Sequence, residues 1–522
     1  MMQTAAQPSL PLAALFTELE RLDIKLWLEA DRLRFNAPPG ALTAELRSRL
    51  QTHKAELIAY LHRAGIHAPE DRMSLSHDAS AQHVSPPSFA QRHFGTLQRQ
   101  NPTACYYNVP FGFHCRGPLD ENLLRQSFNA TIARHEFLRT TLQDIDGALM
   151  QVVAPAGEIH MTVVPLQQLN ATDLAAAIER EIQTECHTPF DLAAESGLRI
   201  RLLRLAQEEY VLLICLHNVA FDTGSLSALL HEVGEHYAAL AGGQPARLPA
   251  LPMQYADCVR WQQALLNSNL EPRLAYWRQW FSRGEPPPVT LLIAKQETPS
   301  PSFHAGTLRC DYAPQLTQQL KQLSQQAGVT LFATLLAAYA LTLYRFSSIG
   351  DVVMGTTFAN RSHWKQEPLI GSLLNILALR IDLSGSPDFL SVLKQVREVF
   401  LAACSHQDVP FAAIAPILQP DQQRTTPLFR TVFSFLGEIP GNQLQFPGIE
   451  VSFMEKIHGE LMFPDLYPTM WEKKTADGMA LTGYWQYKQD LYSAATASAL
   501  LDYFSHVLQA AVANPRLAID TL

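Results

Sequence analysis

The sequence is poor in charged residues and has no excess of basic ones. Charged residues make up 17% of the 522 residues, and the formal net charge is −9 with a pI near 6.1. A protein that neutralises several phosphates needs a basic surface, so we expect no nucleic-acid partner. Hydrophobic residues reach 47%, which is typical of a globular protein, and the length predicts two to four domains.

Cysteine is scarce, and its spacing matches no metal site or disulfide framework. The seven cysteines are odd in number, and none forms a CxxC pair. We therefore predict buried thiols, a reducing compartment and no bound metal. The sequence also has no phosphate-binding loop, dinucleotide GxGxxG unit, HExxH or GxSxG motif in the structural context that its chemistry requires. We therefore expect no bound cofactor.

The sequence lacks a segment long and apolar enough for a membrane. The N-terminal apolar run has no basic residues before it and is soon interrupted by Glu18 and Glu20. The longest apolar stretch, Leu331–Leu343, is well short of the roughly 20 residues that a span requires, so it is predicted to be a buried helix. These features predict a cytoplasmic protein without a secretion signal or a membrane partner.

The first sixty residues have the pattern of a small α/β domain. Apolar residues at helical spacing precede an alternating stretch that begins near Ile24, and a second helical period runs from Leu42 to Leu61. Pro38, Pro39 and Gly40 separate the hairpin from this second helical segment. We place this domain at residues 8–65, followed by a polar, proline-containing linker at residues 66–84.

The remainder of the chain alternates helical segments with β-rich ones. The run YVLLICL at Tyr210–Leu216 has the length and branching of a strand buried on both faces. The segment Leu265–Pro288 fits a crossing helix and loop between two lobes of similar size. We predict an α/β protein with lobes at residues 85–265 and 266–522.

Seven short motifs follow one another in this remainder, and together they resemble the ordered core motifs of condensation domains of nonribosomal peptide synthetases. They are SFAQRHF (Ser88–Phe94), RHEFLRTTL (Arg134–Leu142), HNVAFDT (His217–Thr223), YADCVRW (Tyr255–Trp261), IGSLLNILALR (Ile370–Arg380), HQDVPF (His406–Phe411) and RTTPLF (Arg424–Phe429). Each motif alone is weak, but their order and spacing are specific. Further family-like stretches are Thr188–Leu203 and Gly355–Arg361.

This resemblance implies a chloramphenicol-acetyltransferase-like pseudodimer in one chain, with a central tunnel between two α+β lobes. It also implies acyl transfer from a donor held as a phosphopantetheine thioester on a partner carrier protein. The acceptor would be an amine or a hydroxyl on a second carrier or free in solution, so that both amide and ester products remain open.

The third motif departs from the family pattern His-His-x-x-x-Asp-Gly. His217 matches the first His, Asn218 replaces the second, and Asp222 matches the Asp. We take these three as the candidate catalytic residues, although His217 is also interpreted as a structural residue at a strand end. The resemblance further implies a structural ion pair for Asp222, with Arg139 as first candidate partner and Arg380 as second.

Asn218 changes the chemistry that this site can perform. An amide cannot act as a general base, but it can donate and accept hydrogen bonds and so position a nucleophile or an oxyanion. Losing proton transfer typically costs roughly 10²- to 10⁴-fold in rate. Natural divergence and a deliberate exchange would both give Asn218. Thr223, where the family has Gly, favours natural divergence. It also suggests either a rebuilt loop or a register in which Gly224 takes the role of that Gly.

Residues 15–61 resemble the β-hairpin docking domains of the tubulysin-synthetase type. The resemblance implies that the hairpin edge binds the short, acidic C-terminal tail of an upstream carrier subunit, with Lys25, Trp27, Arg32 and Arg34 as docking residues. A small domain that packs on the large one and binds nothing is the alternative interpretation.

Three functional interpretations follow. The first is a condensation-type acyltransferase of nonribosomal peptide or hybrid polyketide biosynthesis. The second is a catalytically impaired module of the same fold that recruits a carrier or a tailoring partner, which Asn218 supports. The third is a freestanding transferase that uses coenzyme A through an HxxxD site. It is disfavoured by Asn218 and by the docking domain.

Overall fold

The computed structural model of the chain is described for part of its residues, and all structural statements concern these. They are residues 15, 25–29, 32–36, 44–63, 83–282, 291, 304–361, 364–407, 409–411, 414, 430–438, 443–455 and 464–521. Contacts divide the chain into two compact units, residues 1–77 with 362–367 and residues 78–361 with 368–522. The division lies inside the predicted linker, although β3 (His83–Ser85) begins before the predicted end at residue 84.

The first unit contains the hairpin that the sequence predicts. Strands β1 (Lys25–Glu29) and β2 (Arg32–Asn36) pair in antiparallel fashion. Two helices follow, α2 (Ala44–Thr52) and α3 (Lys54–Arg63). The single helical run predicted from Leu42 to Leu61 is therefore divided at His53, while its apolar period is kept because residues such as Leu57 are fully buried.

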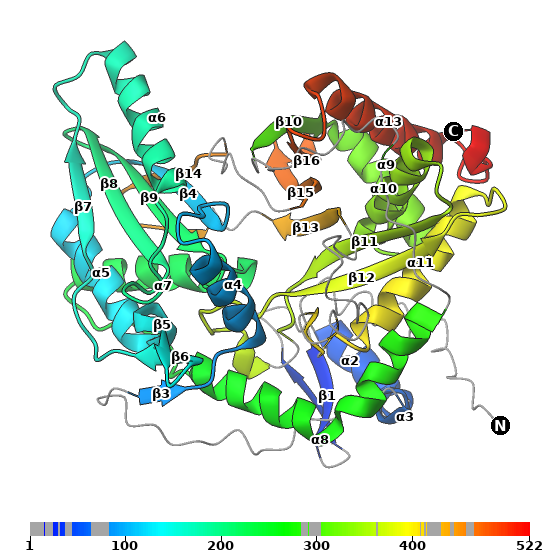
Figure 1. Cartoon of the computed structure of the whole chain (residues 1–522), viewed down its shortest axis with the longest axis horizontal. Coiled ribbons are helices and arrows are strands. Elements are labelled where there is room, and N and C mark those ends of the chain that lie inside the picture. Colours follow the sequence, from blue (N-terminus) through cyan, green and yellow to red (C-terminus); the bar gives the residue numbers. More distant parts are fainter. Residues whose placement is uncertain are drawn as a thin grey trace. The chain divides into compact units, whose positions relative to one another are not determined.

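The amino-terminal lobe of the second unit is centred on a five-stranded sheet of order β14-β4-β9-β8-β7 (Figure 1). The strand predicted at Tyr210–Leu216 is β9, which is antiparallel to both of its neighbours and almost entirely buried. Helix α6 packs against β8 and β9 through an apolar cluster. The elements are α4 (Phe89–Gln100), β4 (Asn108–Arg116), α5 (Glu121–Arg134), η1 (Glu136–Arg139), β5 (Thr140–Ile145), β6 (Ala148–Val153), β7 (Met161–Pro165), α6 (Ala171–His187), β8 (Leu198–Ala206), β9 (Glu209–His217) and α7 (Thr223–Ala241). A smaller sheet has the order β3-β6-β5.

The carboxy-terminal lobe is centred on a six-stranded sheet of order β10-β16-β15-β13-β11-β12. Helices α9, α10 and α13 contact its strands through an extensive apolar core. The buried helix predicted at Leu331–Leu343 is α10, whose central residues are inaccessible to solvent. The elements are β10 (Ala305–Tyr312), α9 (Pro314–Ala327), α10 (Leu331–Ser347), β11 (Asp351–Phe358), β12 (Asn375–Asp382), α11 (Phe389–Cys404), β13 (Val432–Glu438), β15 (Leu466–Thr475), β16 (Gly478–Lys488), α13 (Ala494–Ala513) and η4 (Ile519–Thr521). The short helix η2 (Trp364–Gln366) belongs to the first unit.

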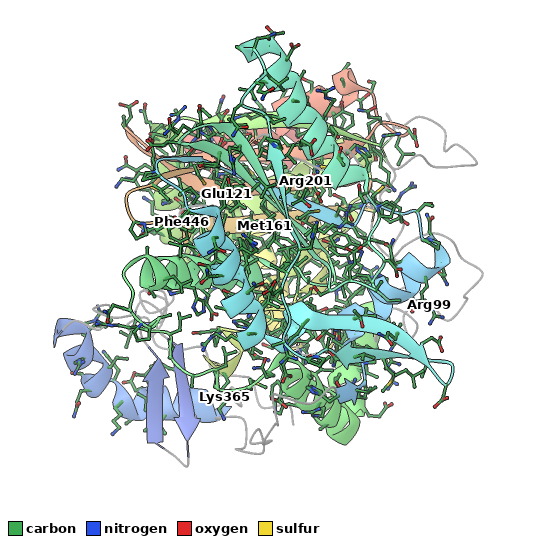
Figure 2. The ribbon with its side chains drawn as sticks, turned by 90° about the vertical axis from the view of Figure 1, so that its left-hand side faces the viewer. Arg99, Glu121, Met161, Arg201, Lys365 and Phe446 are labelled. Carbon is green, nitrogen blue, oxygen red and sulfur yellow. The ribbon has the colours of Figure 1, made fainter. Side chains whose placement is uncertain are left out.

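Two segments cross between the lobes, so the predicted boundary at residues 265 and 266 is too simple. Helix α8 (Tyr255–Ser282) runs through that boundary without a break. Strand β14 (Glu450–Phe453), far along the chain, pairs with β4 and becomes an edge of the amino-terminal sheet. Ahead of β14, Phe446, which is labelled in Figure 2, packs against Tyr237 of α7 with ring centroids 4.6 Å apart. The sequence pattern could not show this exchange, because the four residues of β14 alternate between polar and apolar but do not indicate which sheet the strand joins.

Within the described part of the chain, no single helix combines the length and the apolar character that crossing a membrane requires. Only α9 and α10, bent by 99° at their junction, meet that requirement when they are taken together.

Candidate active site

The turn that joins β9 to α7 carries the three candidate catalytic residues. Strand β9 ends at His217, and Asp222 caps the amino terminus of α7 by accepting from the backbone N–H of Ser225 at 2.6 Å. The N–H of Asn218 donates to the carbonyl of Tyr107 at 2.8 Å, which ties the turn to the segment before β4. The backbone of the turn is therefore fixed at both ends.

His217 lies inside the lobe and is fully buried. Its Nδ1 accepts from the backbone N–H of Val219 at 3.1 Å, while its Nε2 has no hydrogen-bond partner among the described residues. Phe94, Tyr107 and Phe190 surround the imidazole, with ring centroids 6.4, 5.8 and 5.7 Å away. These contacts indicate a structural role rather than a contact with substrate.

The environment of His217 also keeps its imidazole neutral. Burial, helped by the positive charge of Arg199, lowers its pKa from 6.5 to about 3. The guanidinium of Arg199 lies over the Phe190 ring, 3.7 Å from its centroid, and thus on the outside of the aromatic group around His217. At neutral pH the imidazole is therefore neutral and a weak base, and its complete burial keeps it away from an acceptor amine.

Asp222 forms the ion pair that the resemblance implied, but with a different arginine. Its carboxylate oxygens lie 2.7 and 3.0 Å from Nη2 of Arg361, and both side chains are almost completely buried. Asp222 also accepts from the Ser225 hydroxyl at 2.7 Å and from the backbone N–H of Leu373 at 2.9 Å. It therefore joins the turn of the amino-terminal lobe to two segments of the carboxy-terminal lobe.

The predictions of Arg139 and then Arg380 as the partner of Asp222 are wrong. Arg139 belongs to η1, where it donates to the carbonyl of Ala154 and lies 3.7 Å from Glu136. Arg380 on β12 pairs with Asp351 on β11 at 2.5 Å. Both guanidinium groups are thus held by nearer carboxylates. Arg361 ends the stretch GTTFANR, which was the sequence signal available for it.

The residues around this ion pair explain the unusual glycine position. Thr223 is the first residue of α7, where a β-branched residue is tolerated. A Cβ at Gly224 would lie 2.5 Å from Nε of Arg361, so the glycine is needed one residue later than in the family pattern. Asn360 has a φ of 50°, a left-handed conformation that Asn tolerates better than most residues, and it precedes Arg361 directly.

Three of the predicted motifs meet beside this ion pair. The hydroxyl of Tyr255 lies 2.7 Å from the carbonyl oxygen of Ser372 and 2.9 Å from the hydroxyl of Ser88. Gly371 has a φ of 136°, and a Cβ there would overlap the Tyr255 ring. SFAQRHF, YADCVRW and IGSLLNILALR are therefore architectural at these positions.

The motif RHEFLRTTL is also architectural. Arg134 and His135 both contact the carboxylate of Glu232 on α7, at 3.0 and 2.9 Å. Burial alone would raise the pKa of Glu232, but the hydrogen bonds and charges of His135 and Arg134 outweigh it, and the pKa is lowered. This network attaches the end of α5 to the helix that begins at Asp222.

Asn218 is the one candidate catalytic residue whose side chain is partly exposed. Its amide group makes no hydrogen bond to another described residue, in contrast to the closed network around Asp222. Within the described residues, its carbonyl oxygen and its NH₂ group are therefore both available to a ligand.

The two remaining motifs contribute less. Asn375 donates to the carbonyls of Gln407 and Val409 at 2.8 and 2.9 Å, so it holds the HQDVPF segment instead of presenting its amide to a substrate. The motif RTTPLF lies outside the described residues.

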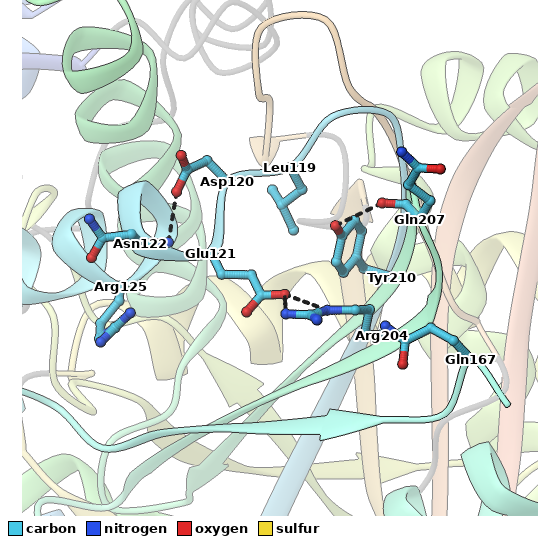
Figure 3. Close-up of a pocket in the computed structure, with 9 residues that line it drawn as sticks. All are labelled: Leu119, Asp120, Glu121, Asn122, Arg125, Gln167, Arg204, Gln207 and Tyr210. Carbon is cyan, nitrogen blue, oxygen red and sulfur yellow. Dashed lines mark hydrogen bonds and ion pairs between the residues drawn. The ribbon is translucent and has the colours of Figure 1, made fainter.

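A hollow of about 780 Å³ lies apart from the turn, at the start of α5 and the turn between β8 and β9 (Figure 3). Glu121 and Arg204 form an ion pair across it. It is lined by Leu119, Asp120, Glu121, Asn122, Arg125, Gln167, Arg204, Gln207 and Tyr210. Since neither Asn218 nor Asp222 lines it, we assign no chemistry to it.

The prediction of buried thiols holds for most of the cysteines. All seven cysteines are free thiols, five of them buried, whereas Cys105 and Cys404 are partly exposed. Among the described residues, no group of three or more His, Cys, Asp or Glu side chains is placed to hold a metal ion.

The four predicted docking residues occupy one hairpin. Trp27 is opposite Arg34 and Glu29 is opposite Arg32 in the register of β1 and β2, and Lys25 is opposite Asn36. Directly opposed residues share a face, and alternate residues along a strand do so as well. Lys25, Trp27, Arg32 and Arg34 are therefore four positions on the same face of the hairpin.

Comparison with protein families gives two matches. The Condensation domain model matches residues 81–522, and the TubC N-terminal docking domain model matches residues 13–63. One of the linear gramicidin synthase subunits of Brevibacillus parabrevis is 34% identical over 441 residues, which cover 84% of this chain and 6% of that protein. The dimodular nonribosomal peptide synthase of Bacillus subtilis is 32% identical over 450 residues, 84% of this chain and 18% of that protein. The chain thus spans a small fraction of the length of these relatives.

Solved structures agree with this match. The complex of the X-domain and OxyB from teicoplanin biosynthesis contains a similar chain, with a TM-score of 0.75, 25% identity, and coverage of 87% of this chain and 98% of that one. The condensation domain of the Monacolin K polyketide synthase MokA has a TM-score of 0.71 at 20% identity, with coverage of 84% and 100%. These similarities confirm the predicted fold.

Proposed function

The chain belongs to the condensation-domain family and carries a TubC-type docking domain at its N-terminus, and we propose that it transfers an acyl or peptidyl group from a carrier-bound thioester to an amine or hydroxyl acceptor. The donor would be held on the phosphopantetheine of a partner carrier protein, with no cofactor bound to this chain. The product would be an amide or an ester in nonribosomal peptide or hybrid polyketide biosynthesis.

The observation that carries this proposal is the contrast within the turn between β9 and α7. The ion pair of Asp222 with Arg361 is complete, and the turn that it holds leaves the Asn218 amide partly exposed and available. A scaffold of this kind supports catalysis by positioning, because hydrogen bonds in a fixed geometry need no reorganisation during the reaction.

The reaction can proceed without a protein base. The acceptor nitrogen or oxygen attacks the thioester carbon, a C–N or C–O bond forms, and the C–S bond breaks with the thiolate as leaving group. The proton of the nucleophile passes to the thiolate. Asn218 would accept a hydrogen bond from the nucleophile through its carbonyl oxygen, or donate one to the oxyanion through its NH₂ group.

We further propose that the docking unit brings the donor carrier to this chain. The hairpin positions Lys25, Trp27, Arg32 and Arg34 lie on one face, and the three basic residues among them suit the acidic C-terminal tail of an upstream carrier subunit. Such a contact raises the effective concentration of the donor. Free thiols at all seven cysteines favour a reducing compartment, and we propose the cytoplasm.

A second function is favoured by one specific observation. Asn218 removes the proton acceptor, and one structural neighbour is an X-domain seen in complex with OxyB. The alternative is therefore a catalytically impaired module that binds a carrier or a tailoring enzyme. It predicts protein binding without turnover.

The deciding experiment is detection of product by intact mass, with a carrier-bound acyl donor and both amine and hydroxyl acceptors. The chain as given is compared with Asn218→His and with Asn122→His, which adds the same imidazole at an exposed position away from the turn. We expect product from the chain as given and roughly 10²- to 10⁴-fold faster transfer by Asn218→His, because the variant regains a proton acceptor.

Two other results would change this assignment. Product from Asn218→His alone would mean that the fold is competent but disabled, which supports recruitment. No product from any of the three proteins with either acceptor would contradict acyl transfer from this donor.

A further inference from the structure

The six-stranded sheet carries a chain of hydrogen-bonded hydroxyl groups on three neighbouring strands. The hydroxyls of Thr357 on β11 and Ser434 on β13 are 2.6 Å apart, and the Ser434 hydroxyl lies 3.1 Å from the phenol oxygen of Tyr467 on β15. We call these three residues the hydroxyl row. Thr357 and Tyr467 are partly exposed, whereas Ser434 between them is 1% exposed.

The hydroxyl row lies on the face of the sheet that the helices do not cover. The neighbouring residues Thr356 and Phe433 are register partners, and the Phe433 ring packs against Tyr339 of α10 with centroids 5.4 Å apart. Because successive side chains of a strand point to opposite faces, Thr357 and Ser434 face away from α10. Ser434 is the register partner of Thr469, two residues from Tyr467 and on the same face.

This face lies between two places where the lobes are joined. On one side, Arg361 follows Thr357 by four residues. This arginine pairs with Asp222 of the other lobe. On the other side, Tyr484 is the register partner of Thr469, and its hydroxyl donates to the carbonyl of Glu455. Glu455 follows β14, the strand inserted into the amino-terminal sheet, by two residues. The hydroxyl row is therefore on the side of the sheet that meets the amino-terminal lobe.

The hydrogen bonds give the hydroxyl row a direction. A serine hydroxyl has one proton, and that of Ser434 is donated to Tyr467, so Thr357 must donate to Ser434. The phenol proton of Tyr467 is then left for another acceptor. Burial raises the pKa of Tyr467 and outweighs the hydrogen bonds of Ser434 and Thr469, which lower it, so the phenol remains protonated and remains a donor at neutral pH.

We propose that Tyr467 donates this proton in a hydrogen bond to a carbonyl oxygen of the bound donor substrate. A contact with a peptidyl carbonyl would select peptidyl donors over those with a plain alkyl chain, whereas a contact with a pantetheine carbonyl would hold every carrier-bound donor alike. This inference rests on the proposed acyl transfer and narrows its substrate class. The carbonyl can belong to a peptidyl chain or to the pantetheine arm, and the two sources share the same chemistry.

The test uses binding, so that it does not depend on turnover. Isothermal titration would measure three stable thioethers: a dipeptidyl pantetheine, an alkyl pantetheine of equal length, and an alkyl thioether of 2-mercaptoethanol without any carbonyl. Tyr467→Phe is compared with Tyr312→Phe, which removes a phenol hydroxyl from the same sheet. Tyr312 is bonded at 2.8 Å to Ser505 of the helix α13 and so lies on the opposite face.

We expect Tyr467→Phe to weaken binding of the dipeptidyl ligand by about two- to tenfold, the effect of one neutral hydrogen bond. Binding of the carbonyl-free thioether should not change, and Tyr312→Phe should change none of the three. Equal weakening for both pantetheine ligands would support the proposal with the pantetheine carbonyl as the source. Thermal unfolding checks that the variants are folded. If Tyr467→Phe is not folded, Ser434→Ala, which removes the hydroxyl that donates to Tyr467, takes its place in the titrations.

Three results would overturn the proposal: unchanged affinity for all ligands, equal weakening for all three, or no binding to the parent chain. Absence of turnover is a separate matter. If Tyr467→Phe weakens binding as expected while no product forms, the proposed acyl transfer fails and the carbonyl site stands.

Discussion

The turn between β9 and α7 has an inner side and an outer side that differ in how firmly they are held. On the inner side, His217 lies among three aromatic rings and Asp222 accepts hydrogen bonds from Arg361, Ser225 and Leu373. On the outer side, the Asn218 side chain is partly exposed and makes no hydrogen bond to another described residue.

This difference separates the part of the motif that maintains the fold from the part that can meet a substrate. The family motif is kept where it is buried and changed where it is accessible. Burial explains the contrast, since a change at an inner position leaves a polar or charged group without compensation. A change at the outer position alters chemistry alone. Substitutions on the two sides should therefore differ greatly in their cost to stability.

The largest effect is expected for Arg361→Ala, which leaves the buried Asp222 carboxylate without its cation. The free energy of unfolding should fall by about 3–5 kcal/mol. Chemical denaturation monitored by intrinsic fluorescence would measure it. The control is Arg99→Ala, which breaks the exposed pair with Asp144 and should cost about 1 kcal/mol or less. Equal costs for the two variants would contradict the inner role of Arg361.

A smaller effect is expected on acidification, through His217. Its pKa in the folded protein is lowered from 6.5 to about 3, so below pH 6.5 the unfolded chain binds the proton more readily. The stability that this group contributes is present above pH 6.5 and is lost as the pH falls toward 3. At about pH 4.5 the loss should be about 3 kcal/mol, because two pH units at about 1.36 kcal/mol each are lost.

The measurement is denaturation at a series of pH values for the parent chain and for His217→Gln. The variant should be less stable at neutral pH, because its side chain no longer fits the aromatic group, yet its stability should fall less steeply with acid. An unchanged slope would mean that other groups cause the acid sensitivity.

The smallest effect on stability is expected for Asn218→Ala on the outer side. Its side chain makes no hydrogen bond that the described fold needs, so the free energy of unfolding should change by less than about 0.5 kcal/mol. Transfer, however, should slow by roughly 10²- to 10³-fold if the amide stabilises the oxyanion. A large loss of stability would show that Asn218 belongs to the inner side after all.

Some of the site could be predicted from the sequence because it depends on local pattern. The strand at Tyr210–Leu216 and the helix at Leu331–Leu343 follow from apolar runs of suitable length, and both are present as β9 and α10. The order of the motifs identified the fold. The inner position of His217 was also anticipated, as the end of a buried strand.

Other features could not be predicted, because they join residues far apart in the chain. The partner of Asp222 is 139 residues away in sequence. Several family-like motifs contain an arginine, so the sequence offers more than one candidate partner. Arg139 and Arg380 are excluded only by their nearer carboxylates, Glu136 and Asp351. The insertion of β14 into the other lobe and the alignment of Thr357, Ser434 and Tyr467 likewise depend on strand order.

The sequence by itself determined the composition of the cores, the order of the motifs and the loss of a proton acceptor at Asn218, because these depend on residue type and spacing along the chain. Only the tertiary structure decided that Arg361 pairs with Asp222, that Gly224 makes room for that guanidinium, and that the hydroxyl row lies on one face. The physical reason is that charge pairs and hydrogen bonds act over a few ångströms in space, irrespective of separation in sequence.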